Sequence, residues 1–85
     1  MLMYKRHEDE EYKVFRTTVF KRDKYKCRFP GCKSRSRNVH HIVPYSKNRF
    51  LRTDPNNGIS LCINHHKLVK GKEIQYARIF MEIIS

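Results

Sequence analysis

Apolar side chains recur at helical spacing near the start of the chain. Tyr12, Phe15 and Val19 stand at positions i, i+3 and i+7, which places them on one face of an α-helix. The acids at Glu8–Glu11 would occupy the first turn, where the helix dipole favours negative charge. We therefore predict a helix from about Glu8 to Asp23.

Two short apolar runs in the middle of the chain predict strands. The first, Val39–Val43, is ended by Pro44, and the second is the stretch "ISLC" at residues 59–62. The segment between them, Tyr45 to Asn57, has the pattern of a loop, and "DPNNG" is its strongest turn signal. We expect the two runs to pair as a β-hairpin.

Two further helices are predicted after the hairpin. A short one runs from Cys62 to about Lys70 and is broken by Gly71. From Glu73 onward, apolar residues at helical spacing predict an amphipathic C-terminal helix, and they are Ile74, Ala77, Met81 and Ile84. We expect this stripe to pack on the core of its own domain, because so short a chain has little apolar surface to spare. Packing against a protein partner is the alternative.

The length of 85 residues predicts a single domain that spans residues 1–85. The predicted elements make it a small α+β domain. A chain this short buries only about 60% of its unfolded surface, so an additional cross-link is expected. We find neither a signal peptide nor an apolar stretch of membrane-spanning length, and three cysteines cannot all pair within one chain. We expect a cytoplasmic protein with reduced thiols and no membrane partner.

Basic residues outnumber acidic ones, 19 to 8, which gives a net charge of +11. Between Lys13 and Arg37 there are ten basic residues and a single acid, Asp23. Such a block favours binding to the phosphate backbone of a nucleic acid, because each neutralised phosphate releases counterions. The candidates for phosphate contacts are Arg16, Lys67 and Lys70.

Two closely spaced pairs of metal-ligating residues are separated by a long insert. Cys27 and Cys32 enclose the turn "RFPG", and Cys62 precedes His65 by three positions. This spacing is typical of a structural zinc site, in which two chain reversals each supply two ligands. His65 and His66 are both within reach of Cys62, and only the common two-residue gap favours His65 as the fourth ligand.

The stretch "NVHHIVP" places His40 and His41 side by side in an expected strand. Neighbouring side chains on a strand point to opposite faces, so these two imidazoles must serve different purposes. A neutral imidazole is a suitable general base near pH 7, and it is also a common metal ligand. If His65 completes the zinc site, His66 is left for another role.

The residues discussed so far resemble the HNH endonuclease family. The resemblance rests on His40-His41-Ile42, on Asn57-Gly58-Ile59-x-Leu61-Cys62 and on x2-His65-His66, together with "FRTTVFKRDKYKC" before them. It covers roughly Phe15 to Lys70. The main departure is His65, where the family more usually has a fourth cysteine.

The resemblance implies a ββα-metal fold held together by zinc, and it also implies roles for individual residues. His40 and His66 would hold a catalytic divalent ion, Mg²⁺ or another such as Mn²⁺. His41 would be the general base, and Asn57 would orient the loop and imidazole of His41. The implied activity is endonucleolytic cleavage of DNA, with RNA not excluded, that leaves 5′-phosphate and 3′-hydroxyl ends. Family proteins of this size are often encoded by phages, which would place this one in the cytoplasm of a host cell.

Two other functions are compatible with parts of this pattern. A non-catalytic zinc module that binds nucleic acid would share the basic block and the four zinc ligands. It would have no use for His40, His41, Asn57 and His66 together. The second alternative is a nuclease subunit that is active only with a protein partner, held through the C-terminal helix.

Overall fold

The computed structural model describes residues 10–85, which form three helices and a two-stranded sheet. Helix α1 spans Glu10–Arg22, strand β1 Asn38–His41 and strand β2 Gly58–Leu61. Helices α2, Ile63–Val69, and α3, Glu73–Ile84, complete the chain. The predicted start of the first helix at Glu8 lies outside the described residues. The α+β class and the predicted order of elements are confirmed.

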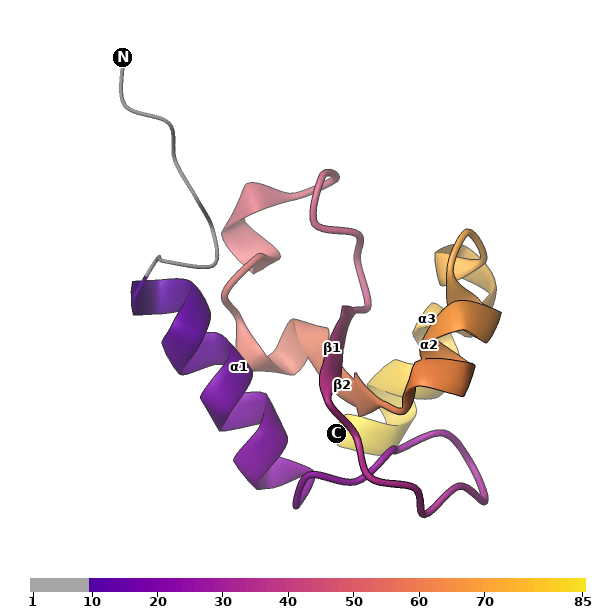
Figure 1. Ribbon diagram of the computed structural model, residues 1–85. Coiled ribbons are helices and arrows are strands. Elements are labelled where there is room, and N and C mark those ends of the chain that lie inside the picture. Colours follow the sequence, from indigo (N-terminus) through magenta and orange to yellow (C-terminus); the bar gives the residue numbers. More distant parts are fainter. Residues whose placement is uncertain (1–9) are drawn as a thin grey trace.

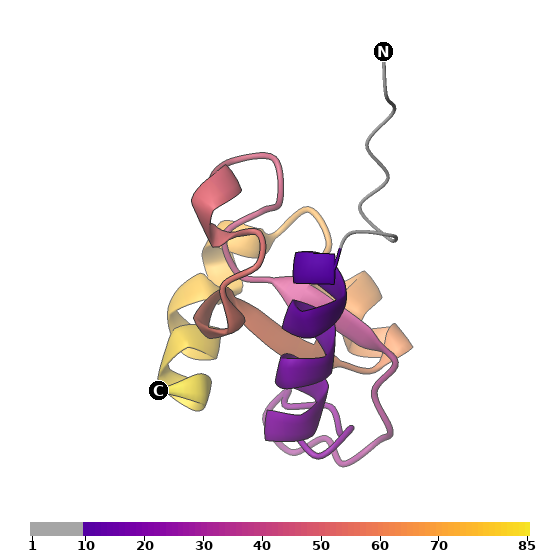
Figure 2. The same ribbon diagram turned by 90° about the vertical axis from the view of Figure 1, so that its left-hand side faces the viewer.

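The two strands form an antiparallel hairpin at the centre of the molecule. His40 pairs with Ile59, and His41 pairs with Gly58. Helix α1 lies on one side of this hairpin, whereas α2 and α3 lie on the other (Figure 1). Figure 2 shows α1 in front of the two strands. The hairpin is thus covered on both faces, and each face contributes to a separate core.

The core on the α1 side is built on the predicted stripe. Tyr12, Phe15 and Val19 are buried there together with Val39 of β1. A Cβ on Gly58 would lie 2.8 Å from atoms of both Phe15 and Val19. Glycine at this position therefore allows α1 to approach β2 closely.

The core on the other side combines residues from β2, α2 and α3. Its buried members include Ile59 and Leu61 of β2, Val69 of α2 and Phe80 of α3. Phe80 is the fully buried side chain of the C-terminal helix, and Tyr76 and Ile83 pack beside it.

The predicted apolar stripe of the C-terminal helix is wrong in two positions. Ile74 is 91% exposed and Met81 is 48% exposed. Ala77 and Ile84 of the predicted stripe do pack on the core. The face that is covered is centred on Phe80, because this large ring fills the space between α3 and the hairpin. The sequence offers apolar residues on more than one face of this helix, and packing selects the aromatic one.

Strand β1 ends at His41, two residues before the predicted end at Val43. The cause is the side chain of Asn57, which bonds to both backbone groups of Val43. The following loop, expected to be irregular, contains two 3₁₀ turns at Arg49–Leu51 and Pro55–Asn57. The second turn lies within "DPNNG" and begins with Asp54, whose carboxylate accepts from the amide of Asn56.

A buried carboxylate connects the end of α1 to the rest of the fold. The side chain of Asp23 is fully buried and accepts hydrogen bonds from Arg22, from Arg28 and from the amide of Ser60. Burial alone would raise the pKa of Asp23, but the bonds from Arg22 and Ser60 outweigh it and lower the pKa below its ordinary value. The one acid of the basic block therefore joins α1 to β2.

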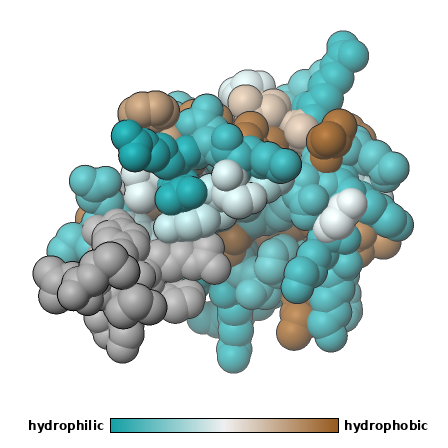
Figure 3. Space-filling view, turned by 90° about the horizontal axis from the view of Figure 1, so that it is seen from above, coloured by the Kyte–Doolittle hydropathy of each residue, from teal (hydrophilic) through white to brown (hydrophobic). Residues whose placement is uncertain are grey.

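The exposed surface is largely polar. Seen from above, hydrophilic residues cover most of the described part of this face, and hydrophobic ones are scattered among them (Figure 3). No helix in residues 10–85 has the length and apolar composition needed to cross a membrane.

Candidate metal-dependent nuclease site

Four predicted zinc ligands meet beside the hairpin. Cys27 and Cys32 flank a tight turn at Gly31, whose φ is +80°, and the amide of Cys32 donates to the carbonyl of Phe29 at 2.9 Å. Cys62 caps the start of α2, and His65 follows in the first turn of that helix. The ligand atoms of these four residues all lie within 4.8 Å of one another.

The distances among these atoms match a tetrahedral metal site. Sγ of Cys62 lies 3.3 Å from Nδ1 of His65, and Sγ of Cys27 lies 3.6 Å from the same nitrogen. The sulfurs of Cys32 and Cys62 are 4.0 Å apart. A tetrahedral zinc ion would separate sulfur from nitrogen by about 3.6 Å and sulfur from sulfur by about 3.8 Å. The group can therefore hold a metal ion, and His65, not His66, is its fourth member.

The surroundings of the four residues suit a bound cation. Burial raises the pKa of the Cys27 thiol to about 11, so in the protein alone this sulfur stays protonated at neutral pH. Hydrogen bonds from Ser34 lower the pKa of the Cys32 thiol to about 6, which favours its thiolate. The ring of Phe29 stacks on His65 at 4.1 Å and 1°, which fixes the imidazole plane. A metal ion would displace the Cys27 proton and be coordinated by all four side chains.

His40 lies on the face of the hairpin that α2 and α3 cover. Its side chain contacts Phe80, with ring centres 5.6 Å apart, and His66, at 6.0 Å. His40 is only 5% exposed, and its Nε2 has no hydrogen-bond partner among the described residues. Burial, and next the neighbouring His66, lower the pKa of His40 to about 4, so the ring is neutral at physiological pH.

His66 belongs to α2 and faces His40, unlike its neighbour His65. Burial and the charge of Lys70 lower the pKa of His66 below its ordinary value. Two neutral imidazoles thus face each other across 6.0 Å. One ion bound by both rings at about 2.1 Å would allow their centres to be at most about 6.5 Å apart. This limit applies to a linear arrangement, and a bent one would bring the ring centres closer than the observed 6.0 Å. The two neutral rings could therefore hold a divalent ion once they move slightly toward each other.

His41 points to the opposite face of the hairpin, toward α1. Its ring stacks on Phe15 at 5.0 Å and on Tyr12 at 6.1 Å. Nε2 of His41 lies 2.9 Å from the carbonyl oxygen of Arg52. Because a carbonyl only accepts, Nε2 donates, and the basic lone pair of the neutral ring is therefore on Nδ1. The two adjacent histidines do occupy opposite faces, as the strand predicts.

Asn57 braces the loop that holds His41. Its side-chain oxygen accepts from the amide of Val43 at 2.8 Å, and its amide nitrogen donates to the carbonyls of Val43 and Leu51 at 3.1 and 3.2 Å. Leu51 precedes Arg52, whose carbonyl holds the His41 imidazole. The side chain thus holds the part of the loop that precedes the Arg52 carbonyl.

The sequence did not single out Arg52 and Tyr45, which also surround His41. The Arg52 guanidinium lies 4.2 Å from the centre of the Tyr45 ring and donates to the Tyr45 carbonyl at 2.6 Å. The Tyr45 ring meets the edge of His41 at 5.4 Å. Both residues lie in the long loop, where no periodic pattern could identify them. Only the folded loop brings them beside His41.

The three predicted phosphate-binding residues lie on two separate parts of the surface. Arg16 projects from α1, whereas Lys67 and Lys70 are exposed at α2, on the other side of the hairpin (Figure 1). The structure does not bring them into one patch. Of the three, Lys70 acts on the histidine pair, because its charge adds to burial in lowering the pKa of His66.

The family model of the HNH endonucleases matches residues 27–69, half of the chain. The chain therefore belongs to the HNH endonuclease family, and the match supports a nuclease-type function in general. The matched residues include the four side chains that could hold a metal ion, the hairpin and α2, whereas α1 and α3 lie outside them. No curated protein and no solved structure matches the chain.

Proposed function

We propose that the chain is a metal-dependent DNA endonuclease, in which His41 is the general base and His40 and His66 hold the divalent ion. The observation that carries the proposal is the division of the two adjacent histidines. One is buried with an unpartnered nitrogen opposite His66, and the other is held by a loop carbonyl on the opposite face. A structural protein has no use for this arrangement, because an unpartnered buried nitrogen costs free energy.

His41 would accept a proton from the attacking water at Nδ1. The hydrogen bond from Nε2 to the Arg52 carbonyl fixes the tautomer and the ring plane, so the lone pair has a constant direction. Phe15 and Tyr12 support the ring from α1. The Arg52 carbonyl would also stabilise the imidazolium that forms when the proton is taken up.

His40 and His66 would bind the ion through neutral imidazoles, Mg²⁺ or another divalent ion such as Mn²⁺. When bound, the ion supplies positive charge that stabilises the oxygen leaving the phosphodiester. The low pKa of His40 keeps this residue free of a competing proton throughout the physiological range. Phe80 packs on the His40 ring and limits its rotation.

The four-residue group would hold a structural zinc ion. Its support is the set of distances around Nδ1 of His65, which suits three thiolates and one imidazole. The group joins the loop after α1 to the start of α2. It would therefore hold His66, the next residue, in place for the second ion.

The partner would be DNA, bound first through its phosphates. The net charge of +11 favours association with a polyanion, and the basic block contributes most of it. Lys70 lies close enough to His66 to affect its pKa, so it would meet a phosphate beside the ion.

The experiment that tests the proposal is relaxation of supercoiled plasmid by the purified chain, with and without added Mg²⁺ or Mn²⁺. We expect relaxation that depends on the divalent ion and on His41. The control is His41→Ala with wild-type zinc content and melting temperature, which should leave the plasmid intact over the same period. A wild-type chain that binds zinc and folds, yet leaves the plasmid supercoiled with both ions, would overturn the proposal.

A further inference from the structure

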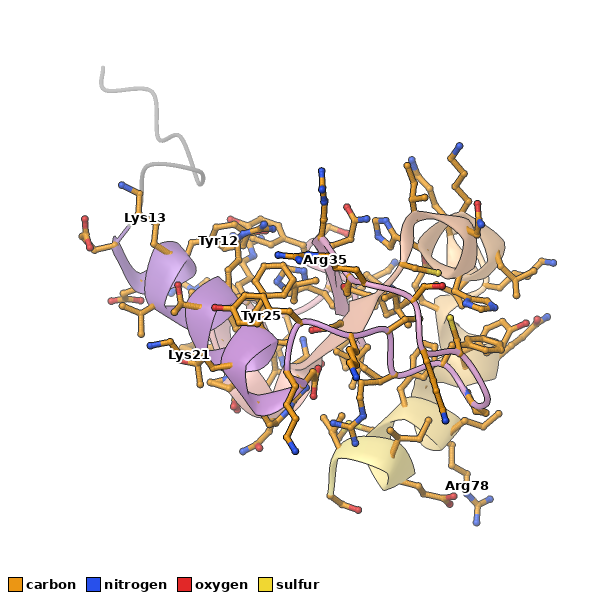
Figure 4. All side chains as sticks on the ribbon, turned by 60° about the horizontal axis from the view of Figure 1, so that its bottom comes forward. Tyr12, Lys13, Lys21, Tyr25, Arg35 and Arg78 are labelled. Atoms are coloured by element: carbon orange, nitrogen blue, oxygen red, sulfur yellow. The ribbon has the colours of Figure 1, made fainter. Side chains whose placement is uncertain are left out.

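Arg16, Phe20 and Tyr25 form a stack of one cation and two aromatic rings on the surface of α1. The rings of Phe20 and Tyr25 have centres 5.6 Å apart and are nearly parallel, at 12°. The guanidinium carbon of Arg16 lies 5.0 Å from the centre of the Phe20 ring. Tyr25 is 44% exposed, although it is a large aromatic residue. Tyr25 follows the end of α1 in the chain, and Figure 4 shows it beside that helix.

The backbone at the end of α1 turns Tyr25 back over the helix. Lys24 and Tyr25 have φ values of +56° and +59°, in the left-handed region that favours glycine. The amide of Tyr25 donates to the carbonyl of Phe20 at 2.9 Å, and the amide of Lys24 donates to Lys21 at 3.2 Å. These bonds define a Schellman motif, which usually includes an apolar contact between the residues at the Phe20 and Tyr25 positions. The motif requires only an apolar side chain, so it does not account for an exposed aromatic ring.

A shallow hollow continues from this stack toward His41. It has a volume of about 200 Å³, and its lining includes Tyr12, Arg16 and Phe20. These three residues are four positions apart, so they follow one stripe of α1 that is about 12 Å long. Tyr12, at the far end, stacks on His41. The stripe thus leads from His41 to Tyr25.

Cations border the stripe along its length. Lys13 lines the hollow with Arg16, and Lys24 precedes Tyr25. Asp23, the acid beside Tyr25, is buried and already paired with Arg22. At the other end, Glu10 and Glu11 lie in the first turn of α1, and Glu10 is 3.9 Å from Lys13. Stacking rings flanked by cations are the means by which proteins bind single-stranded nucleic acid, because bases stack on the rings and phosphates meet the cations. A duplex turns its base faces toward one another and offers this surface only its phosphates.

We propose that Arg16, Phe20 and Tyr25 bind unpaired nucleotides beside the phosphodiester that is cleaved. The protein would then bind nucleic acids with a single-stranded stretch more tightly than uniform duplexes. The direction of the bound strand, from Tyr25 toward His41, rests on the function proposed above. The stacking surface itself does not depend on cleavage, so its binding can be measured separately.

The test compares Tyr25→Leu with Tyr25→Phe in the full zinc-loaded chain, without a catalytic divalent ion. Leucine preserves the apolar contact of the helix end but removes the ring, whereas phenylalanine keeps the ring. The probes are a short single-stranded oligodeoxynucleotide, an RNA of the same sequence, a blunt duplex, and an abasic strand of equal charge. Affinity is measured by fluorescence anisotropy, with melting temperature and zinc content as checks on folding.

We expect Tyr25→Leu to weaken binding of the single-stranded DNA by about 5- to 150-fold, the effect of losing one stacked base. Binding of the duplex and the abasic strand should change less than twofold, and Tyr25→Phe should resemble the wild type on every probe. An equal loss on the abasic strand, or no loss on the single strand, would overturn the proposal. A loss on the RNA would extend the proposal to both nucleic acids, whereas a loss confined to RNA would overturn it for DNA. If the binding results hold while plasmid is not cleaved, the nuclease function fails and the stacking surface stands.

Discussion

His40 and His41 have different surroundings although they are neighbours in the sequence. His40 is buried against Phe80 and His66, and its pKa is lowered to about 4. His41 is stacked on α1 and donates a hydrogen bond to the Arg52 carbonyl. The strand accounts for the opposite orientation of the two side chains, since successive side chains of a strand face opposite layers, and the packing of each layer accounts for the rest. Replacement of His40 and replacement of His41 should therefore affect different properties, metal binding and cleavage rate respectively.

We expect His41→Ala to bind the divalent ion and DNA like the wild type, but to lose about two to four orders of magnitude in cleavage rate. His40→Ala should instead weaken binding of the ion, so that more metal restores part of the rate, and His66→Ala should behave alike. Asn57→Ala should resemble a milder His41→Ala, because its side chain acts on His41 through the loop. The measurement is cleavage rate as a function of divalent-ion concentration for all four variants.

Zinc content and melting temperature serve as controls for this series, so that loss of folding is not taken for loss of chemistry. Rescue of His41→Ala by excess metal, with His40→Ala remaining inactive, would show that the two assigned roles are exchanged. Wild-type rates in all four variants would contradict the site altogether.

At the scale of elements, the hairpin is a partition between two cores. Helix α1 covers one face with Phe15 and Val19, and α2 and α3 cover the other around Phe80. Gly58 is the point of closest approach on the α1 side, where a Cβ would lie 2.8 Å from both covering side chains. Phe15 also stacks on His41, so the packing of α1 extends directly to the candidate base.

Gly58→Ala should therefore destabilise the fold and disturb His41. The added methyl must displace Phe15 or Val19, at a cost of about 1–3 kcal/mol in the free energy of unfolding. The displaced ring should also shift the NMR resonances of the His41 imidazole. The matched control is Gly71→Ala, where φ is +82° but a Cβ would meet no atom within 4 Å.

Gly71→Ala should lose about 1 kcal/mol through backbone strain alone and leave the His41 resonances unchanged. Urea unfolding and heteronuclear spectra of the two variants provide the measurement. Unshifted His41 signals in a folded Gly58→Ala protein would show that Phe15 is not positioned by this close approach.

At the scale of the whole molecule, the four-residue metal group links parts of the chain that are far apart in sequence. Cys27 and Cys32 follow α1, whereas Cys62 and His65 begin α2. A domain of this size has a net stability of only about 5–15 kcal/mol, and binding of structural zinc contributes on the order of 10 kcal/mol. Burial also keeps Cys27 protonated in the protein alone, so its thiolate depends on the ion.

Removal of zinc should consequently unfold the domain. We expect strong chelators, or Cys27→Ser, to abolish the cooperative thermal transition and the helical circular dichroism signal. His65→Cys should preserve both, because cysteine restores a four-ligand set, whereas His65→Ala should not. Metal analysis accompanies each sample. A folded protein without tightly held zinc, or equal behaviour of the two His65 variants, would contradict the assignment of these ligands.

Local rules were sufficient to predict much of the molecule. The stripe of α1, the turn at Gly31 and the antiparallel hairpin follow from spacing and turn chemistry, which act within a few residues. Local rules did not predict the buried face of the C-terminal helix, because Ile74 belongs to the predicted apolar stripe and is exposed. That helix has apolar residues on several faces, and only the shape of the hairpin core selects Phe80.

The sequence by itself determined the classes of side chain and their local spacing. These were two cysteine-containing pairs, two histidines that must face apart, and an excess of positive charge. Only the tertiary structure decided whether His65 or His66 joins the three cysteines, because both are within helical reach of Cys62. The two side chains point in different directions around α2, and the packing of α2 on the hairpin turns His65 toward the cysteines and His66 toward His40. The tertiary structure alone also brought the Arg52 carbonyl to His41, since that contact joins residues eleven positions apart in a loop that Asn57 holds in place. Spacing along the chain specifies local geometry, whereas contacts across loops depend on the packing of the whole domain.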